Sequence, residues 1–322
     1  MIPLQLLIFV IGLVILYFGA EWLVKGAAGL AIRYGIRPMV VGITVVALAT
    51  SMPEFVVNFL AALDGEDSLA LGNVVGSNIA NIGLILGISA LVLPLAVSST
   101  TLRNEYPMMM GVALLFYLLS LDGTISRIDG GILITGLAAF FIYVIRDTRK
   151  HAALVTRAVE GEEDELAGSG DPIWKQALYI AAGVAALAGG AQLMVKAAVT
   201  IAEFLGISPI VIGLTVVAIG TSLPELAASI ASALKKDADM SVGNVLGSNL
   251  LNILFVIGMV SLIRPLHVDT ESLHIHFPVM LGFSLLLLPL AWTRFQISRL
   301  EGALLLAGFA GYIVYLVLPY VG

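Results

Sequence analysis

The chain has 322 residues, of which 59% are hydrophobic and 12% are charged, and its mean hydropathy is +1.04. These values lie far outside the range of ordinary soluble domains, and the lack of cysteine excludes disulfides and thiol chemistry. The formal net charge of −6 is modest and gives no reason to expect a nucleic-acid partner. The sequence therefore predicts a chain whose main surroundings are the lipid bilayer.

Long apolar stretches recur along almost the whole chain. Crossing the hydrocarbon core of a membrane takes about 20 mostly apolar residues. Stretches of this kind predict ten spans, at residues 2–24, 39–63, 69–94, 105–121, 128–146, 173–200, 208–234, 241–263, 274–292 and 299–318. The first stretch is interpreted as a span rather than a cleaved signal peptide, because no basic region precedes it and it continues into Glu21. We expect an all-α polytopic membrane protein.

One long polar connection, at residues 147–172, divides the chain into halves. It contains the acidic run Glu162, Glu163, Asp164 and Glu165, which lacks the spacing of a calcium-binding loop. We expect a solvated cytoplasmic linker here. The predicted domains are a first five-helix repeat at residues 1–146 and a second five-helix repeat at residues 173–322.

Lysine and arginine are distributed unevenly over the predicted loops. Of the 16 basic residues, all but Arg127, Lys196 and Arg264 lie on one side of the ten spans. The positive-inside rule assigns the basic side to the cytoplasm. The sequence therefore predicts a multi-pass protein of the cell membrane with both termini outside the cytoplasm.

The two halves repeat each other. A constant shift of 171 positions aligns residues 19–95 with residues 190–266, and 33 of these 77 positions are identical without a gap. Equivalent residues lie five spans apart, on the second and seventh spans for example, so the two copies cross the membrane in opposite directions. Inverted repeats provide two related conformations of one scaffold and hold their ions near mid-membrane. The predicted mechanism is alternating access.

Each copy contains an acidic residue inside an apolar span, at Glu54 and at Glu225. A charged carboxylate at mid-membrane costs about 3 kcal/mol or more, so it normally faces a protein interior and a functional partner. Pro53 and Pro224 remove a backbone donor and clash with the preceding turn. Both spans are therefore predicted to break at these prolines, beside a pair of acids that bind a cation.

Other oxygen donors precede each predicted break. Hydroxyls and freed backbone carbonyls are expected at Ala47, Thr50 and Ser51 in the first copy, and at Ala218, Thr221 and Ser222 in the second. Hard oxygen donors suit calcium or sodium better than softer transition metals. The expected ligand is therefore a hard cation.

A second matching element follows in both copies, at residues 72–81 and 243–252. Each contains Gly-Asn-x-x-Gly-Ser-Asn and ends in a further asparagine. Two pairs, Ser77 with Asn81 and Ser248 with Asn252, are spaced one helical turn apart and can present oxygens on one face. The glycine pairs, Gly72 with Gly76 and Gly243 with Gly247, have the spacing that lets membrane helices approach closely. This element is predicted to bring oxygens to the glutamates.

With these motifs the sequence resembles the sodium/calcium exchanger family of the calcium/cation antiporter superfamily. The two repeats of that family carry Thr-Ser-x-Pro-Glu followed by Gly-Asn-x-x-Gly-Ser-Asn, which occur here within residues 39–94 and 208–265. The likeness covers essentially the whole chain and is to a compact prokaryotic type without a large regulatory domain. It implies a secondary active antiporter that exchanges sodium for calcium.

The resemblance also implies roles for individual residues. It implies that Glu54 and Glu225 bind calcium, together with the backbone oxygens of Thr50 and Thr221. It implies that sodium binds at flanking positions of both copies, which are Ala47, Ser51, Ser77, Ala218, Ser222 and Ser248. Asn81 and Asn252 fall at the central position. Some relatives carry aspartate in place of Asn252, as the potassium-dependent exchangers do, so the asparagine argues against potassium transport.

The two glutamates set the predicted charge of the site at −2. One calcium ion or two sodium ions balance this charge, so a third sodium ion would make exchange electrogenic. The expected partners are calcium and sodium ions and the lipid bilayer, with no cofactor and no obligatory protein partner.

Three other functions were weighed against sodium/calcium exchange. A proton/calcium antiporter on the same scaffold stays open, because a glutamate in an apolar pocket can exchange a proton for calcium. A cation channel could be lined by similar oxygens, but the inverted duplication argues against it. An intramembrane enzyme is not expected, because no His, Cys or Lys lies in a span near the acidic pair.

Overall fold

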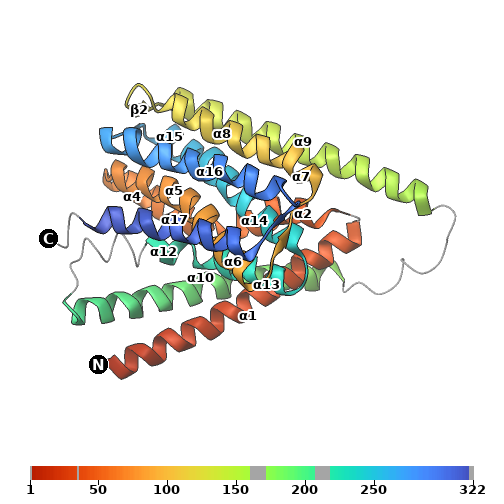
Figure 1. Ribbon diagram of the computed structural model, residues 1–322, viewed down its shortest axis with the longest axis horizontal. Coiled ribbons are helices and arrows are strands. Elements are labelled where there is room, and N and C mark those ends of the chain that lie inside the picture. The colour runs from red at the N-terminus through yellow and green to blue at the C-terminus, as the bar shows by residue number, and fades with distance from the viewer. Residues whose placement is uncertain (1, 35, 160–171, 207–217, 319–322) are drawn as a thin grey trace.

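The computed structural model describes residues 2–34, 36–159, 172–206 and 218–318. Long helices lie side by side in one bundle, and the two chain ends lie at the same end of it (Figure 1). The elements of the first half are α1 (Ile2–Tyr34), α2 (Pro38–Val41), the π-helical turn η1 (Gly42–Val46), α3 (Ala47–Thr50), α4 (Met52–Asp64), α5 (Asp67–Ala80), the π-helical turn η2 (Asn81–Leu86), α6 (Gly87–Val92), β1 (Leu95–Ala96), α7 (Ser99–Arg103), α8 (Glu105–Leu119), β2 (Thr124–Ile125) and α9 (Arg127–Val159).

The second half repeats this order of elements. They are α10 (Ile173–Phe204), α12 (Ala218–Thr221), α13 (Leu223–Leu234), α14 (Ala238–Leu251), the π-helical turn η4 (Asn252–Ile257), α15 (Gly258–Ile263), β3 (Leu266–His267), the π-helical turn η5 (Ser272–His276), α16 (Phe277–Trp292), β4 (Gln296–Ile297) and α17 (Arg299–Val317). A shift of 171 positions converts the bounds of α5 into those of α14, and those of η2 into those of η4. The sequence repeat is therefore a repeat of structure.

The helices account for the ten predicted spans. Among the described residues, seven helices are long and apolar enough to cross a membrane, and the bent pair Met39–Thr50 and Met52–Asp64 makes an eighth span. The predicted fourth span is α8, an apolar helix of 15 residues. The predicted seventh span contains α12 and α13, while its first part, at residues 208–217, lies outside the described residues.

Two short antiparallel ribbons connect the halves. In one, β1 pairs with β4 and Leu95 lies opposite Ile297; in the other, β2 pairs with β3 and Ile125 lies opposite Leu266. The chain crosses the bundle once between β1 and β2, through α8, so the two ribbons lie at opposite ends. Because β1 and β3 are equivalent strands of the two copies, the copies are inverted relative to each other.

Two helical spans form the centre of the bundle. In the spans Asp67–Val92 and Ala238–Ile263, 83% and 78% of the most apolar window is buried, against 17% in Ile2–Ala31 and 28% in Ile173–Phe204. The polar residues of the second motif lie on these two central spans. They therefore face protein rather than lipid, which is the arrangement that an ion site inside a membrane requires.

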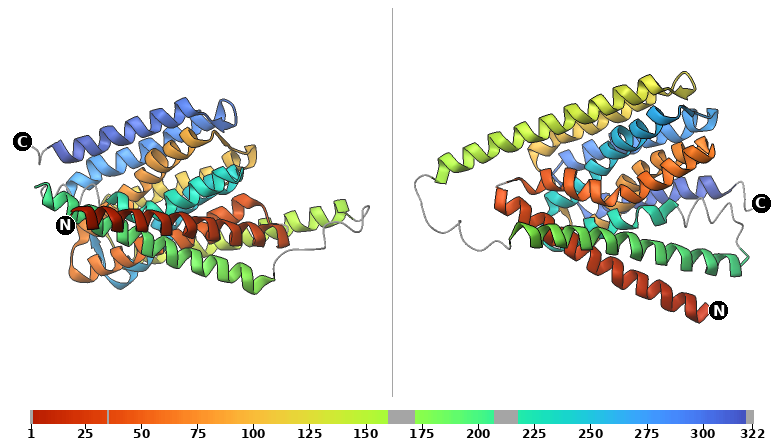
Figure 2. Two further views of the ribbon diagram at one scale, coloured as in Figure 1. Left: turned by 90° about the horizontal axis from the view of Figure 1, so that it is seen from below. Right: turned by 180° about the vertical axis from the view of Figure 1, so that it is seen from behind.

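The outer helices α1 and α10 pack tightly against each other. A Cβ atom at Gly19 would lie 2.7 Å from the backbone N of Leu187, and one at Gly183 would lie 2.6 Å from the backbone N of Leu23. Only glycine permits such an approach of two backbones. Figure 2 shows these two helices, in red and green, lying together along one edge of the bundle.

Candidate ion-binding site

Each glutamate-bearing span is broken at a serine. Ser51 has φ −85° and ψ 4°, and Ser222 has φ −88° and ψ 4°, so the same non-helical conformation occurs in both copies. In the first copy the two parts of the span are bent by 45°. The break lies two residues before the proline, which occupies the first turn of the next helix, where a missing N–H breaks no helical hydrogen bond.

The break places both glutamates in the first turn of a helix that starts inside the protein. Glu54 lies in the first turn of α4 and Glu225 in the first turn of α13, and each is 1% exposed. The N-terminus of a helix favours negative charge. Within the described part of the chain, no basic side chain forms an ion pair with either acid. A bound cation or a proton can neutralise these carboxylates.

Side chains of the two copies meet at this point. The hydroxyl of Ser51 donates to Oε1 of Glu225 at 3.1 Å, and the hydroxyl of Thr50 donates to Oδ1 of Asn244 at 3.3 Å. Ser51 lies three residues before Glu54, so the break of the first copy contacts the carboxylate of the second. The acidic pair predicted from the repeat is therefore a pair in space, at the interface of the two copies.

Asn81 and Asn252 are held by asparagines of the opposite copy. The side-chain amide of Asn81 donates to Oδ1 of Asn249 at 2.9 Å, and that of Asn252 donates to Oδ1 of Asn78 at 3.3 Å. Asn249 and Asn78 are equivalent residues of the two repeats, so the contacts form a crossed pair. Each bond uses the NH₂ group of the predicted ligand, while its oxygen remains available to a cation.

The helix changes its geometry at the same two asparagines. The π-helical turn η2 begins at Asn81, and η4 begins at Asn252. Short π-helical segments inside α-helices are rare and are frequent at functional sites. The sequence analysis treated both segments as regular helix, and the asparagines gave no signal of this change.

Seven buried oxygens of the predicted ligands have no hydrogen-bond partner within the described part of the chain. They are Glu54 Oε2, Glu225 Oε2, Asn81 Oδ1, Asn252 Oδ1, Ser77 Oγ, Ser222 Oγ and Ser248 Oγ. A buried polar atom without a partner costs about 1–3 kcal/mol, and a bound cation would offset this cost for several oxygens at once. A hard cation satisfies such oxygens together, and the donor set fits calcium or sodium.

Of the remaining predicted ligands that the structure describes, Ala47, Thr50 and Ser51 are at most 1% exposed and Thr221 is half-buried. The side chain of Ala218 lies outside the described residues. The carbonyl of Ala47 accepts hydrogen bonds from the backbone N–H of Ser51 at 2.9 Å and from the hydroxyl of Thr50 at 3.3 Å. The expectation that the break frees the Ala47 carbonyl is therefore not met in this conformation.

The sequence analysis missed the residues that orient the acidic helices. The side-chain amide of Asn58 donates to the backbone O of Glu54 at 2.6 Å. In the second copy Ser229 takes the place of Asn58, and the amide of Asn244 instead reaches the backbone O of Glu225 at 3.2 Å and the hydroxyl of Ser229 at 2.9 Å. The repeat itself could have indicated Asn244, Asn78 and Asn249, because all three belong to the duplicated motif.

Within the described residues, no group of three or more His, Cys, Asp or Glu side chains is placed to hold a metal. The site combines two carboxylates with neutral oxygens, which distinguishes it from the nitrogen and sulfur sites of transition metals.

Comparison with known proteins identifies the family. Residues 4–146 and 175–318 match the sodium/calcium exchanger protein family. The chain belongs to this family. It is therefore a cation/calcium antiporter of the exchanger type and a multi-pass membrane protein, and not an enzyme.

Several relatives match this antiporter over nearly their full length. It is 40% identical to the putative antiporter CaxA of Alkalimonas amylolytica, over 94% of this chain and 95% of that protein. It is 36% identical to the inner membrane protein YrbG of Escherichia coli strain K12, over 97% and 95% of the two chains. It is 31% identical to the sodium/calcium exchanger MaX1 of Methanosarcina acetivorans, over 98% and 99%.

Solved structures of the sodium-calcium exchanger NCX_Mj share the fold of this antiporter. One was soaked with 2.5 mM Na⁺ and 10 mM Sr²⁺, and it matches with a TM-score of 0.80 and 32% sequence identity, over 98% of this chain and 99% of that chain. Another was soaked with 2.5 mM Na⁺ and 0.1 mM Ca²⁺ and matches equally well. The likeness covers both repeats and therefore the whole ten-helix architecture.

Proposed function

We propose that the protein exchanges sodium for calcium across the cell membrane by alternating access. The observation that carries the proposal is the set of seven unpartnered oxygens on predicted ligands of both copies, among them one oxygen of each buried glutamate. Calcium and sodium compete for these oxygens, and proteins with inverted repeats can expose one central site to either side of the membrane in turn.

The proposed calcium ligands are Glu54 and Glu225, with the backbone oxygens of Thr50 and Thr221. The proposed sodium ligands are the flanking positions Ala47, Ser51, Ser77, Ala218, Ser222 and Ser248, and Asn81 and Asn252 complete the centre. The burial of the described side chains in this set supports the assignment. For Ala47 to bind sodium through its carbonyl, the Thr50 hydroxyl must turn away from it.

The charge of the site supports electrogenic exchange. Two carboxylates carry a charge of −2, and Asn252 adds none. Three sodium ions exchanged for one calcium ion would move one net positive charge, which is worth about 2.3 kcal/mol per 100 mV of membrane potential. We propose this ratio and an exchange that does not need potassium.

The proposal includes an orientation in the membrane and a pair of helices that move. From the distribution of basic residues we propose that both termini lie outside the cytoplasm and the 147–172 linker inside, with residues 1–146 and 173–322 as the two repeats. The close packing of α1 against α10 supports motion of these two helices as one unit past the central spans. Only 17% and 28% of their most apolar windows are buried, against 83% and 78% in the central spans.

Calcium uptake into proteoliposomes under separately imposed ion gradients tests the proposal. Vesicles loaded with sodium and diluted into sodium-free medium should take up calcium, while outward potassium gradients and pH gradients alone should not drive uptake. Glu54→Gln and Glu225→Gln should reduce uptake by about a hundredfold or more, and Glu203→Gln, on the exposed end of α10, serves as the control. Uptake driven by a pH gradient without sodium would replace this proposal with proton/calcium exchange.

A further inference from the structure

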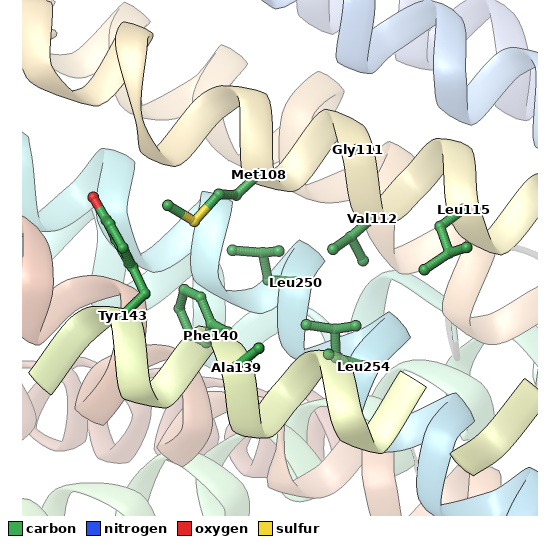
Figure 3. Close-up of a pocket in the computed structure, with 10 residues that line it drawn as sticks. Met108, Gly111, Val112, Leu115, Ala139, Phe140, Tyr143, Leu250 and Leu254 are labelled. Carbon is green, nitrogen blue, oxygen red and sulfur yellow. The ribbon is translucent and has the colours of Figure 1, made fainter. Parts of the chain in front are cut away.

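A long groove opens between α8, α9 and the central span of the second copy. Its inner part has a volume of about 340 Å³, with Met108 and Val112 of α8 facing Phe140 of α9 and with Leu250 and Leu254 between them (Figure 3). A second cavity of about 540 Å³ continues the groove along α9. Ala139 and Tyr143 line both cavities, so the two form one continuous groove.

The groove changes from apolar to polar along one face of α9. Its lining residues Gly136, Ala139, Tyr143 and Arg146 are three or four positions apart, which places them on the same helical face. Ten residues of helix rise about 15 Å, which is half of the roughly 30 Å thickness of the hydrocarbon core. The groove therefore has the length of one leaflet, with the charged end at the level of the lipid headgroups.

The charged end of the groove is lined by Arg146 and Asp147. Asp147 accepts from Arg37 at 3.1 Å, and the same guanidinium binds Glu105 at 3.0 Å, so both acids at this end are already held by Arg37. Arg146 is exposed and has no ion-pair partner among the described residues. Arg149 and Lys150 follow it in the sequence. An anionic group is the complement of this end.

The repeat explains why the groove is open in the first copy. A Cβ atom at Gly111 would have no described atom within 4 Å. In the second copy Phe283 replaces Val112. From β2 and β4 onward the equivalent residues are 172 positions apart, so Gly308 is the equivalent of Gly136, and the ring of Phe283 lies 3.3 Å from its Cβ position. An aromatic ring thus covers the surface that the first copy leaves open.

We propose that this groove binds an anionic phospholipid of the leaflet on the basic side of the membrane. One acyl chain lies between α8 and α9 against Leu250 and Leu254, and the phosphate contacts Arg146. The length, the apolar walls and the exposed arginine without an ion-pair partner in the described part of the chain match this ligand, whereas a soluble anion would leave the apolar part of the groove empty.

Native mass spectrometry of the purified full chain, mixed with phosphatidylglycerol and phosphatidylcholine of identical acyl chains, tests the proposal. Wild type should retain phosphatidylglycerol preferentially. Arg146→Gln should lower its retention about fivefold, the effect of removing about 1 kcal/mol for one cationic side chain near an anionic headgroup, without changing phosphatidylcholine. Arg294→Gln, which removes an exposed arginine elsewhere on the predicted basic side, is the matched control and should change neither lipid.

Filling the apolar part of the groove tests it separately. Gly111→Phe should reduce retention of both lipids, whereas Gly282→Phe, at the equivalent exposed position of the second copy, should not. If Gly111→Phe does not fold, Val112→Phe introduces the residue that the second copy carries. Equal effects of Arg146→Gln and Arg294→Gln, or unchanged retention in a folded groove-filling variant, would overturn the proposal.

Discussion

The side-chain amide of Asn81 donates to Oδ1 of Asn249 at 2.9 Å, and Asn252 makes the same contact with Asn78 at 3.3 Å with the copies exchanged. Each bond joins the two repeats across their interface. Each also leaves the oxygen of a predicted ligand without another hydrogen-bond partner. Asn78 and Asn249 therefore hold the amide groups of the predicted ligands Asn252 and Asn81 and leave the oxygens of these ligands free to bind a cation.

Removing one of these positioning residues should weaken calcium binding. Asn249→Ala deletes the acceptor for Asn81, so the amide of Asn81 is no longer held and its oxygen loses its fixed direction. A hydrogen bond contributes about 1 kcal/mol, so we expect the apparent KM for calcium to rise about fivefold with a smaller change in maximal rate. Proteoliposome uptake over a range of calcium concentrations measures both quantities. Asn104→Ala, in the segment before α8, is the control, and an equal effect there would contradict the positioning role.

Neutralising either glutamate should abolish stabilisation by calcium without lowering the stability of the calcium-free protein. Both carboxylates are buried without a basic partner among the described residues, so Glu54→Gln or Glu225→Gln should not lower the melting temperature in calcium-free detergent. Calcium at a hundred times its Kd stabilises a binding protein by about 2.7 kcal/mol. We expect calcium to raise the melting temperature of wild type and of Glu203→Gln but not of the two site variants. A full calcium-induced shift in Glu225→Gln would remove this residue from the site.

Exchange should respond to membrane voltage. If three sodium ions leave a vesicle for each calcium ion that enters, one positive charge moves outward, so an inside-positive potential should accelerate uptake. Potassium and valinomycin impose the potential, and radioactive calcium reports the rate. Vesicles clamped at zero potential with equal potassium on both sides provide the reference. A rate that is independent of potential would indicate two sodium ions per calcium.

Widening the contact between α1 and α10 should be costly. A Cβ atom at Gly190 would lie 2.7 Å from the backbone N of Leu16, whereas one at the neighbouring Gly189 has no described atom within 4 Å. Overpacking costs about 1–3 kcal/mol, so Gly190→Val should lower the melting temperature and slow transport. Gly189→Val introduces the same side chain on the same helix and should do neither. Similar effects of both substitutions would mean that the contact is unimportant.

The predicted orientation can be tested by labelling, because the chain contains no cysteine. A membrane-impermeant maleimide added to intact cells should label Glu66→Cys, in the connection between α4 and α5, and should not label Arg294→Cys. Both positions are exposed. Labelling of both variants after the membrane is permeabilised shows that each cysteine can react. The reverse pattern in intact cells would place both termini in the cytoplasm.

Much of the architecture could be read from the sequence, because it depends on properties that the order of residues expresses directly. The shift of 171 positions and the odd separation of equivalent spans predicted the inverted repeat, which the ribbons β1 with β4 and β2 with β3 confirm. Glu54 and Glu225 were recognised as a pair because an acid inside an apolar span is energetically exceptional. Both side chains are buried, and their role as cation ligands stays a prediction.

Other features were decided only when the helices packed. The breaks lie at Ser51 and Ser222, two residues before the prolines at which the sequence predicted them. Proline is accommodated in the first turn of the following helix. The contacts between Asn81 and Asn249 and between Asn252 and Asn78 join residues 168 and 174 positions apart. The choice of such partners depends on how closely the two central spans approach. Composition and periodicity determine which residues leave lipid, whereas the hydrogen bonds that orient them depend on distances that exist only in the folded chain.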